Sequence, residues 1–217
     1  MSRRILCFGD SNTWGYNGAD GSRFDENTRW TAVLQKSLGL QYTIIEEGLN
    51  GRTVCIDDSF EDGKNGLRYL LPCMESHMPF ELLIVMLGTN DMKSYFDITA
   101  SDIADGMERL IRTALKFFQN KQHLAETKIM ILSPVCIGKK ITGSSMSDIF
   151  DQTAAAKSEQ LSELYRTLAH RYDCHFLDAA QYAQAGLADS VHIDADGHAS
   201  LAIALKNYIT QNDINLL

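Results

Sequence analysis

Several features that mark other classes of protein are missing from this chain of 217 residues. No apolar run approaches the roughly 18 residues that a membrane-spanning helix needs. After Arg3-Arg4 the first apolar segment lasts only from Ile5 to Phe8 before Gly9, which is too short for the core of a secretory signal peptide. We therefore expect no membrane partner.

Paired cysteines are also missing. The chain has five cysteines, an odd number, scattered without CxxC spacing: Cys7, Cys55, Cys73, Cys136 and Cys174. This pattern predicts neither a disulfide framework nor a zinc site, and it suits a reducing cytoplasm. Since no second His or Cys has ligand-like spacing, we expect no metal.

Basic clusters and glycine-rich phosphate loops are absent as well. The formal net charge is −8 and the pI is near 5.2, which argues against a nucleic-acid partner. Neither GxGxxG nor GxxxxGK[ST] occurs, which disfavours a nucleotide-binding module. GxSxG is missing too, so the nucleophile elbow of the α/β hydrolases is not the right template.

The apolar pattern predicts alternating strands and helices in one domain, residues 1–217. Near-continuous apolar runs suit parallel strands covered on both faces. We expect strands at Ile5–Phe8, Tyr42–Glu46, Leu82–Leu87, Lys128–Leu132 and His175–Leu177. Stripes at helical spacing lie between or after them: Trp30, Val33, Leu34 and Leu38; Ile103, Met107, Leu110, Ile111, Leu115 and Phe118; Leu161, Leu164, Tyr165 and Leu168; Leu201, Ile203, Leu205 and Ile209. The order predicts a three-layer α/β/α sandwich with a central parallel sheet of about five strands, of flavodoxin-like build.

Three residues from the two ends of the chain could form a nucleophilic triad. Ser11 follows the first strand, and His192 stands three residues after Asp189. A serine hydroxyl needs a base to take its proton, and a carboxylate fixes the tautomer of that base. We therefore predict Ser11 as nucleophile, His192 as base and Asp189 as its orienting acid, provided that the two ends of the chain meet.

Donors for the negative oxygen of a tetrahedral intermediate can also be located. Gly51 could present its backbone N–H, Asn90 a side-chain amide, and Ser11 its own N–H. Each follows a predicted strand, and such loops meet at the carboxyl edge of a parallel sheet. The sequence thus predicts an oxyanion hole beside Ser11.

These blocks resemble the SGNH (GDSL-type) hydrolase family. Gly9-Asp10-Ser11-Asn12, Gly51, Gly88-Thr89-Asn90-Asp91 and Asp189-Ser190-Val191-His192 match its four signatures in family order. The chain is also similar to a bacterial arylesterase and acyltransferase subgroup, through residues 4–11, 46–49 and 86–91. That resemblance implies short acyl chains such as acetyl, self-association, and the site roles given above. Asn12 departs from the commoner leucine, residues 16–29 are shorter, and residues 137–148 do not match.

Our interpretation is a serine esterase of small acyl esters, with carbohydrate or aryl esters as substrates and no cofactor. One alternative is an acyltransferase that passes the acyl group to an alcohol, and another is a non-catalytic binding module of the same fold. Asn12, Trp14, Tyr16 and Val191 are candidates for substrate contact. The irregular segment 137–148 is expected to form a mobile loop over the same edge.

Overall fold

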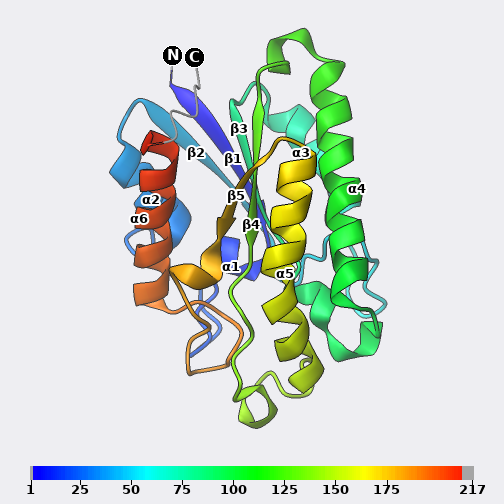
Figure 1. Cartoon of the computed structure of the whole chain (residues 1–217). Coiled ribbons are helices and arrows are strands. Elements are labelled where there is room, and N and C mark those ends of the chain that lie inside the picture. Colours follow the sequence, from blue (N-terminus) through cyan, green and yellow to red (C-terminus); the bar gives the residue numbers. More distant parts are fainter. Residues whose placement is uncertain (1, 212–217) are drawn as a thin grey trace.

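The computed structural model describes residues 2–211, whose five strands form one sheet between two layers of helices (Figure 1). The strands are β1 (Arg3–Gly9), β2 (Tyr42–Gly48), β3 (Leu82–Met86), β4 (Lys128–Ser133) and β5 (His175–Asp178). Their order across the sheet is β2-β1-β3-β4-β5, and every neighbouring pair is parallel. The predicted fold class is confirmed, down to the flavodoxin-like strand order.

Helices cover both faces of the sheet. Helices α2 (Trp30–Leu38) and α6 (Ala195–Gln211) pack against each other on one face, and α3 (Gly66–His77), α4 (Ala100–Gln119) and α5 (Gln152–Arg171) cover the other (Figure 1). The short helix α1 (Ser11–Trp14) directly follows β1. Within residues 2–211, no helix combines the length and the apolar character needed to cross a bilayer.

The strands divide the core into two halves because successive side chains point to opposite faces. Leu6 and Phe8 pack under α3 to α5, whereas Ile5 and Cys7 pack under α2 and α6. All four side chains are fully buried. The near-continuous apolar runs seen in the sequence therefore reflect strands that are covered on both sides.

Two details differ from the sequence-based expectation. Ile203 was placed in the buried stripe of the last helix, but it is 56% exposed. It stands two residues from both Leu201 and Leu205, and a two-residue step turns a helix by about 200°, so it faces solvent. The second is helix α3, for which no stripe was expected: its buried Leu70, Cys73 and Met74 do have helical spacing, and Asn65 starts the helix by accepting a hydrogen bond from the Arg68 N–H at 3.2 Å.

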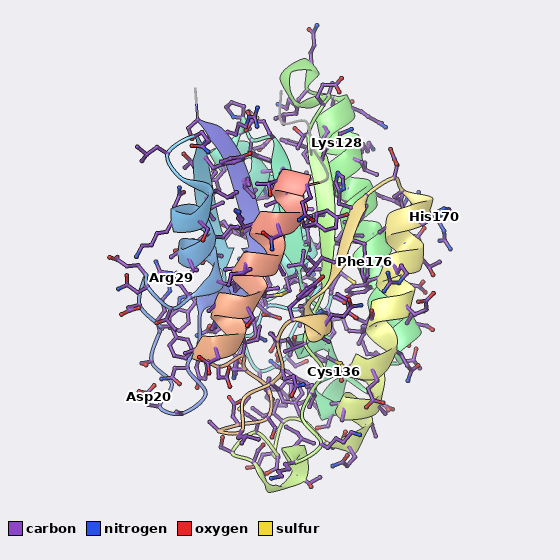
Figure 2. The ribbon with its side chains drawn as sticks, turned by 60° about the vertical axis from the view of Figure 1, so that its left-hand side comes forward. Asp20, Arg29, Lys128, Cys136, His170 and Phe176 are labelled. Carbon is purple, nitrogen blue, oxygen red and sulfur yellow. The ribbon has the colours of Figure 1, made fainter. Side chains whose placement is uncertain are left out.

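Strand register places the predicted site at one edge of the sheet. Gly9 is level with Gly48 on one side and with Met86 on the other. The loops that follow carry Ser11, Gly51 and Asn90, so all three leave the sheet on the same edge. Figure 2 shows β4 running from Lys128 at the far end of the molecule toward Cys136 at this end.

Candidate active site

The structure brings the two ends of the chain together at Ser11 and His192. His192 Nε2 lies 2.9 Å from Ser11 Oγ, although the two residues are 181 positions apart. On the other side of the ring, His192 Nδ1 lies 2.5 Å from Asp189 Oδ2. All three residues are buried, with at most 6% of their surface exposed. A hydroxyl, an imidazole and a carboxylate are thus connected in series.

The Asp189 carboxylate is itself held by the backbone around it. Its Oδ1 accepts hydrogen bonds from the N–H groups of Val191 and His192, both at 2.9 Å. Ser190 makes this tight loop possible with a φ of 66°. Burial alone would raise the pKa of Asp189, but the hydrogen bonds and the imidazole hold it below its ordinary value. The carboxylate therefore stays charged and orients the ring.

Ser11 stands at the first position of α1, in a turn organised by Asp10. Asp10 caps this helix by accepting a hydrogen bond from the Asn12 N–H at 2.9 Å. The turn packs closely on the ends of the strands: a Cβ added to Gly9 would lie 2.0 Å from Thr13 Oγ1, and one added to Gly48 would lie 2.2 Å from the Trp14 nitrogen. Glycine is required at both positions because any side chain would lift the turn off the strands.

The three predicted donors converge around Ser11. In the described residues 2–211, the backbone N–H groups of Ser11 and Gly51 have no acceptor. Asn90 Nδ2 donates to the Arg52 carbonyl at 3.1 Å, which fixes the amide and leaves its second N–H available. Ser11, Gly51 and Asn90 line one cavity together with His192. This is the arrangement that an oxyanion hole needs.

The cavity beside Ser11 has a volume of about 140 Å³. It has a polar side and an apolar side. Its lining consists of Ser11, Tyr16, Asn50, Gly51, Glu61, Asn90, Lys93, Met146, Ile149, Phe150 and His192. Met146 comes from the irregular segment 137–148, so that segment does lie over this edge of the sheet, and its own Ile141 is fully buried.

Of the four residues singled out for substrate contact, Tyr16 lines this cavity and the other three do not. The Tyr16 ring lies 4.2 Å from the His192 ring, centroid to centroid. The side chain of Asn12 is buried and accepts a hydrogen bond from the Ile193 N–H. Val191 packs into the core, and Trp14 carries the Arg23 guanidinium over its ring at 5.3 Å. Nearness in sequence to Ser11 or, for Val191, to His192 predicted where these residues lie but not the direction of their side chains.

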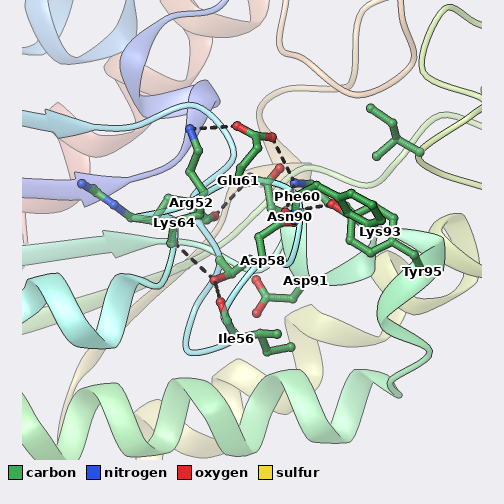
Figure 3. A network of polar contacts seen from close by, with 12 residues as sticks. Arg52, Ile56, Asp58, Phe60, Glu61, Lys64, Asn90, Asp91, Lys93 and Tyr95 are labelled. Carbon is green, nitrogen blue, oxygen red and sulfur yellow. Dashed lines mark hydrogen bonds and ion pairs between the residues drawn. The ribbon is translucent and has the colours of Figure 1, made fainter.

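Charged residues beside the cavity were missed by the sequence analysis. Lys93 Nζ lies 2.7 Å from Asp58 Oδ2, and both side chains are almost fully buried. Glu61 lies between two lysines, with Oε2 at 3.0 Å from Lys64 Nζ and Oε1 at 3.8 Å from Lys93 Nζ (Figure 3). Two signals could have found this network: Lys93 stands three residues after Asn90, and segment 57–62 is rich in acidic residues, which attract lysines.

Two buried acids, Asp10 and Asp91, belong to the loops that carry Ser11 and Asn90. Burial raises the pKa of Asp10 to about 6 and that of Asp91 to about 7. Both oxygens of Asp91 accept from the Val54 N–H, at 2.9 and 3.0 Å, and so tie the loop that carries Gly51 to the loop that carries Asn90. Asp91 therefore holds two of the three donor segments together.

One group of potential metal ligands occurs within residues 2–211. Donor atoms of Glu47, Cys73 and His77 all lie within 4.8 Å of one another. His77 Nε2 donates to Glu47 Oε1 at 2.7 Å, and the Arg52 guanidinium lies 3.9 Å from the second carboxylate oxygen. Burial raises the pKa of Cys73 to about 12, so the sulfur is a protonated thiol at neutral pH. The hydrogen bond to His77 and the neighbouring Arg52 explain why Glu47 is found here.

Comparison with known proteins places the fold and these motifs in one family. Residues 7–200 match the model of the GDSL-like lipase/acylhydrolase family. The aryl esterase of M. smegmatis is 35% identical, with a TM-score of 0.90 over 97% of this chain and 99% of that one. A carbohydrate acetylesterase from Sinorhizobium meliloti is 33% identical, with a TM-score of 0.89 over 97% of this chain and 100% of that one. No curated protein matches in sequence. The chain belongs to the GDSL-like lipase/acylhydrolase family.

Proposed function

We propose that this protein is a serine esterase that hydrolyses short-chain acyl esters through an acyl-serine intermediate. The observation that carries the proposal is the buried series Ser11 Oγ–His192–Asp189, with separations of 2.9 and 2.5 Å. The family and the esterases among its structural neighbours support the same reaction class.

In the first half of the reaction, Ser11 Oγ attacks the ester carbonyl while its proton passes to His192 Nε2. Asp189 stabilises the imidazolium that forms. The oxyanion is stabilised by the N–H groups of Ser11, Gly51 and Asn90, and His192 then protonates the leaving alkoxide. In the second half, His192 activates water, which attacks the acyl-serine and releases the acid.

The cavity supports a small acyl group. Its volume of about 140 Å³ is below the roughly 300–1,000 Å³ of pockets for larger ligands. Met146, Ile149 and Phe150 supply its apolar wall, and Phe150 is buried to 1% exposure. An acetyl group fits this wall, and a long chain would have to displace it. Aryl and carbohydrate esters are the proposed substrates because the structural neighbours act on them.

The proposal is tested by p-nitrophenyl acetate hydrolysis and by intact mass after treatment with a serine-reactive phosphonate. Wild type should hydrolyse the ester and gain one adduct, and Ser11→Ala should lose both. Ser101→Ala, an exposed serine of α4, is the matched control and should keep both. Equal rates in wild type and Ser11→Ala, with no adduct on either, would show that Ser11 is not the nucleophile.

The acyltransferase alternative shares the acyl-serine step and differs only in the acceptor. The ratio of free acid to new ester, measured in water with added alcohol, therefore shows directly how the acyl-serine divides between hydrolysis and acyl transfer. A cytoplasmic location and self-association also belong to this proposal. All five cysteines are free thiols, which is compatible with a reducing compartment, and sedimentation would give the number of subunits.

A further inference from the structure

One peptide group of the oxyanion hole is held from behind by a cation. Lys64 Nζ donates to the Asn50 carbonyl at 2.8 Å. That carbonyl belongs to the same peptide group as the Gly51 N–H. In a trans peptide the carbonyl and the N–H point in opposite directions, so a group that binds one end sets the direction of the other. Gly51 lines the catalytic cavity, and Lys64 packs against Gly51 without lining that cavity itself.

The Asn50–Gly51 peptide is the central peptide of a turn that is closed by a 3.1 Å hydrogen bond from the Arg52 N–H to the Leu49 carbonyl. Such a turn forms with the central peptide in either of two orientations, so this bond does not by itself set the direction of the Gly51 N–H. Gly51 has a φ of 79°, and as a glycine it could adopt other backbone conformations at little cost. In the described part of the chain, neither Asn50 nor Gly51 donates a backbone hydrogen bond to another residue. A rotation of this peptide would turn its carbonyl oxygen toward the cavity, where it would repel an oxyanion.

Lys64 is itself held in place. Glu61 Oε2 lies 3.0 Å from Lys64 Nζ, and the same carboxylate reaches Lys93, whose ammonium is anchored on the buried Asp58 (Figure 3). Both side chains lie against Gly51: a Cβ added there would be 3.3 Å from Lys64 Cε and 3.5 Å from Glu61 Oε2. The lysine thus has a fixed position and also offsets a negative charge that lines the cavity.

We propose that Lys64 is a positioning residue of the oxyanion hole, which keeps the Gly51 N–H directed into the catalytic cavity by binding the Asn50 carbonyl. The inference rests on the esterase function proposed above. The Lys64 ammonium also polarises the Asn50–Gly51 peptide, since hydrogen bonds in a chain strengthen one another. Lys64 does not line the cavity beside Ser11, so in this proposal it acts through the peptide.

The test compares Lys64→Met, Lys64→Arg and the control Lys128→Met by steady-state hydrolysis of p-nitrophenyl acetate. Lys128 is an exposed lysine at the opposite end of the sheet (Figure 2). For Lys64→Met we expect kcat and kcat/KM to fall together, on the order of tenfold, because the lost contact matters only when the oxyanion forms. Inactivation by the phosphonate should slow by the same factor. Lys64→Arg should restore most of the activity.

A second set of variants separates the positioning effect from simple charge compensation. Among residues 2–211, Lys64→Met also leaves Glu61 with only Lys93, 3.8 Å away, as a neighbouring cation beside the oxyanion, so the substitution is repeated in a Glu61→Gln background. If Lys64 positions the peptide, the loss of about tenfold persists there. If the loss of activity disappears in the Glu61→Gln background, Lys64 acts only by neutralising Glu61 and the inference is wrong.

Thermal unfolding identifies a merely structural effect. A variant that unfolds more easily but keeps wild-type kcat below its transition temperature would also overturn the inference. Failure of the esterase function itself gives a different result: wild type and Ser11→Ala would then be equally slow, before Lys64 is considered.

Discussion

Asn12 Oδ1 accepts a hydrogen bond from the Ile193 N–H at 2.9 Å, and so joins the residue after Ser11 to the residue after His192. The two loops come from opposite ends of the chain. The Asn12 carbonyl in turn accepts from Trp30 Nε1 at 3.0 Å, which connects the same turn to helix α2. The separation between Ser11 and His192 is therefore fixed by contacts of the Asn12 side chain and of its backbone.

Asn12→Ala should destabilise the protein and slow hydrolysis. The substitution leaves the buried Ile193 N–H without an acceptor, which costs about 1–3 kcal/mol. The spacing between Ser11 and His192 also loosens, so kcat should fall. Urea unfolding and steady-state kinetics measure the two effects. Asn27→Ala removes an exposed asparagine and is the control. Equal stability of the two variants would contradict this role of Asn12.

Asn90→Ala should reduce hydrolysis far more than stability. Removing one oxyanion donor typically lowers the rate by roughly 100- to 1000-fold. The fold loses only the hydrogen bond to the Arg52 carbonyl, worth about 1 kcal/mol. The measurements are kcat/KM for p-nitrophenyl acetate and the Tm. A fall in kcat/KM of less than about tenfold would show that Asn90 is not a donor to the oxyanion.

Lys93→Met should strongly destabilise the fold at neutral pH. It would leave Asp58 buried and charged without its cation, which costs about 3–5 kcal/mol. The double variant Asp58→Asn/Lys93→Met removes the buried charge and should recover part of the loss. Unfolding in urea at pH 7 measures both. A double variant no more stable than Lys93→Met would count against the buried pair as the cause.

The same pair predicts a loss of stability in acid. Burial alone would raise the pKa of Asp58, but the hydrogen bonds from Lys93, Phe60 and Tyr95 hold it below its ordinary value. A carboxyl with a lowered pKa stabilises the fold above its unfolded pKa, and that contribution is lost as the pH falls through the folded value. Asp58→Asn should therefore flatten the decline in Tm below about pH 4. An unchanged slope would contradict the assignment.

His198 gives a second pH dependence, at higher pH. Its Nδ1 accepts from the Trp30 N–H at 3.2 Å, and burial lowers its pKa to about 4. The unfolded chain binds a proton near pH 6.5, whereas the folded one does so only near pH 4, so stability falls as the pH drops between these values. His198→Asn should remove this part of the Tm profile. His170→Asn, at the exposed end of α5, should keep it, and a profile unchanged in both would refute the role of His198.

The strands and most of the candidate site could be predicted from the sequence. Ser11, Gly51 and Asn90 each follow a strand directly, so parallel order alone brought them to one edge. Asp189 and His192 are three apart and meet within one local loop. These positions depend on short distances along the chain, which can be counted in the sequence.

The rest depends on contacts between distant segments. Lys64 reaches Asn50 only because the loop of residues 57–65 folds back over Gly51. Asn12 and Val191 were placed near the substrate by sequence proximity, yet their side chains point into the protein. Sequence spacing determines where a backbone passes. Side-chain direction is decided by packing partners that the spacing does not reveal.

The cavity wall formed by Met146, Ile149 and Phe150 has an evolutionary consequence. The reacting groups sit on the loops after β1, β2 and β3 and on the loop before α6, whereas this wall belongs to the connection between β4 and α5. Substitutions or insertions in that one connection can reshape the acyl pocket and leave the proton-transfer geometry intact. The apolar wall and the reacting groups are therefore encoded on separate stretches of the gene, so this wall can diverge while the chemistry is retained, whereas Tyr16 shares its connection with Ser11.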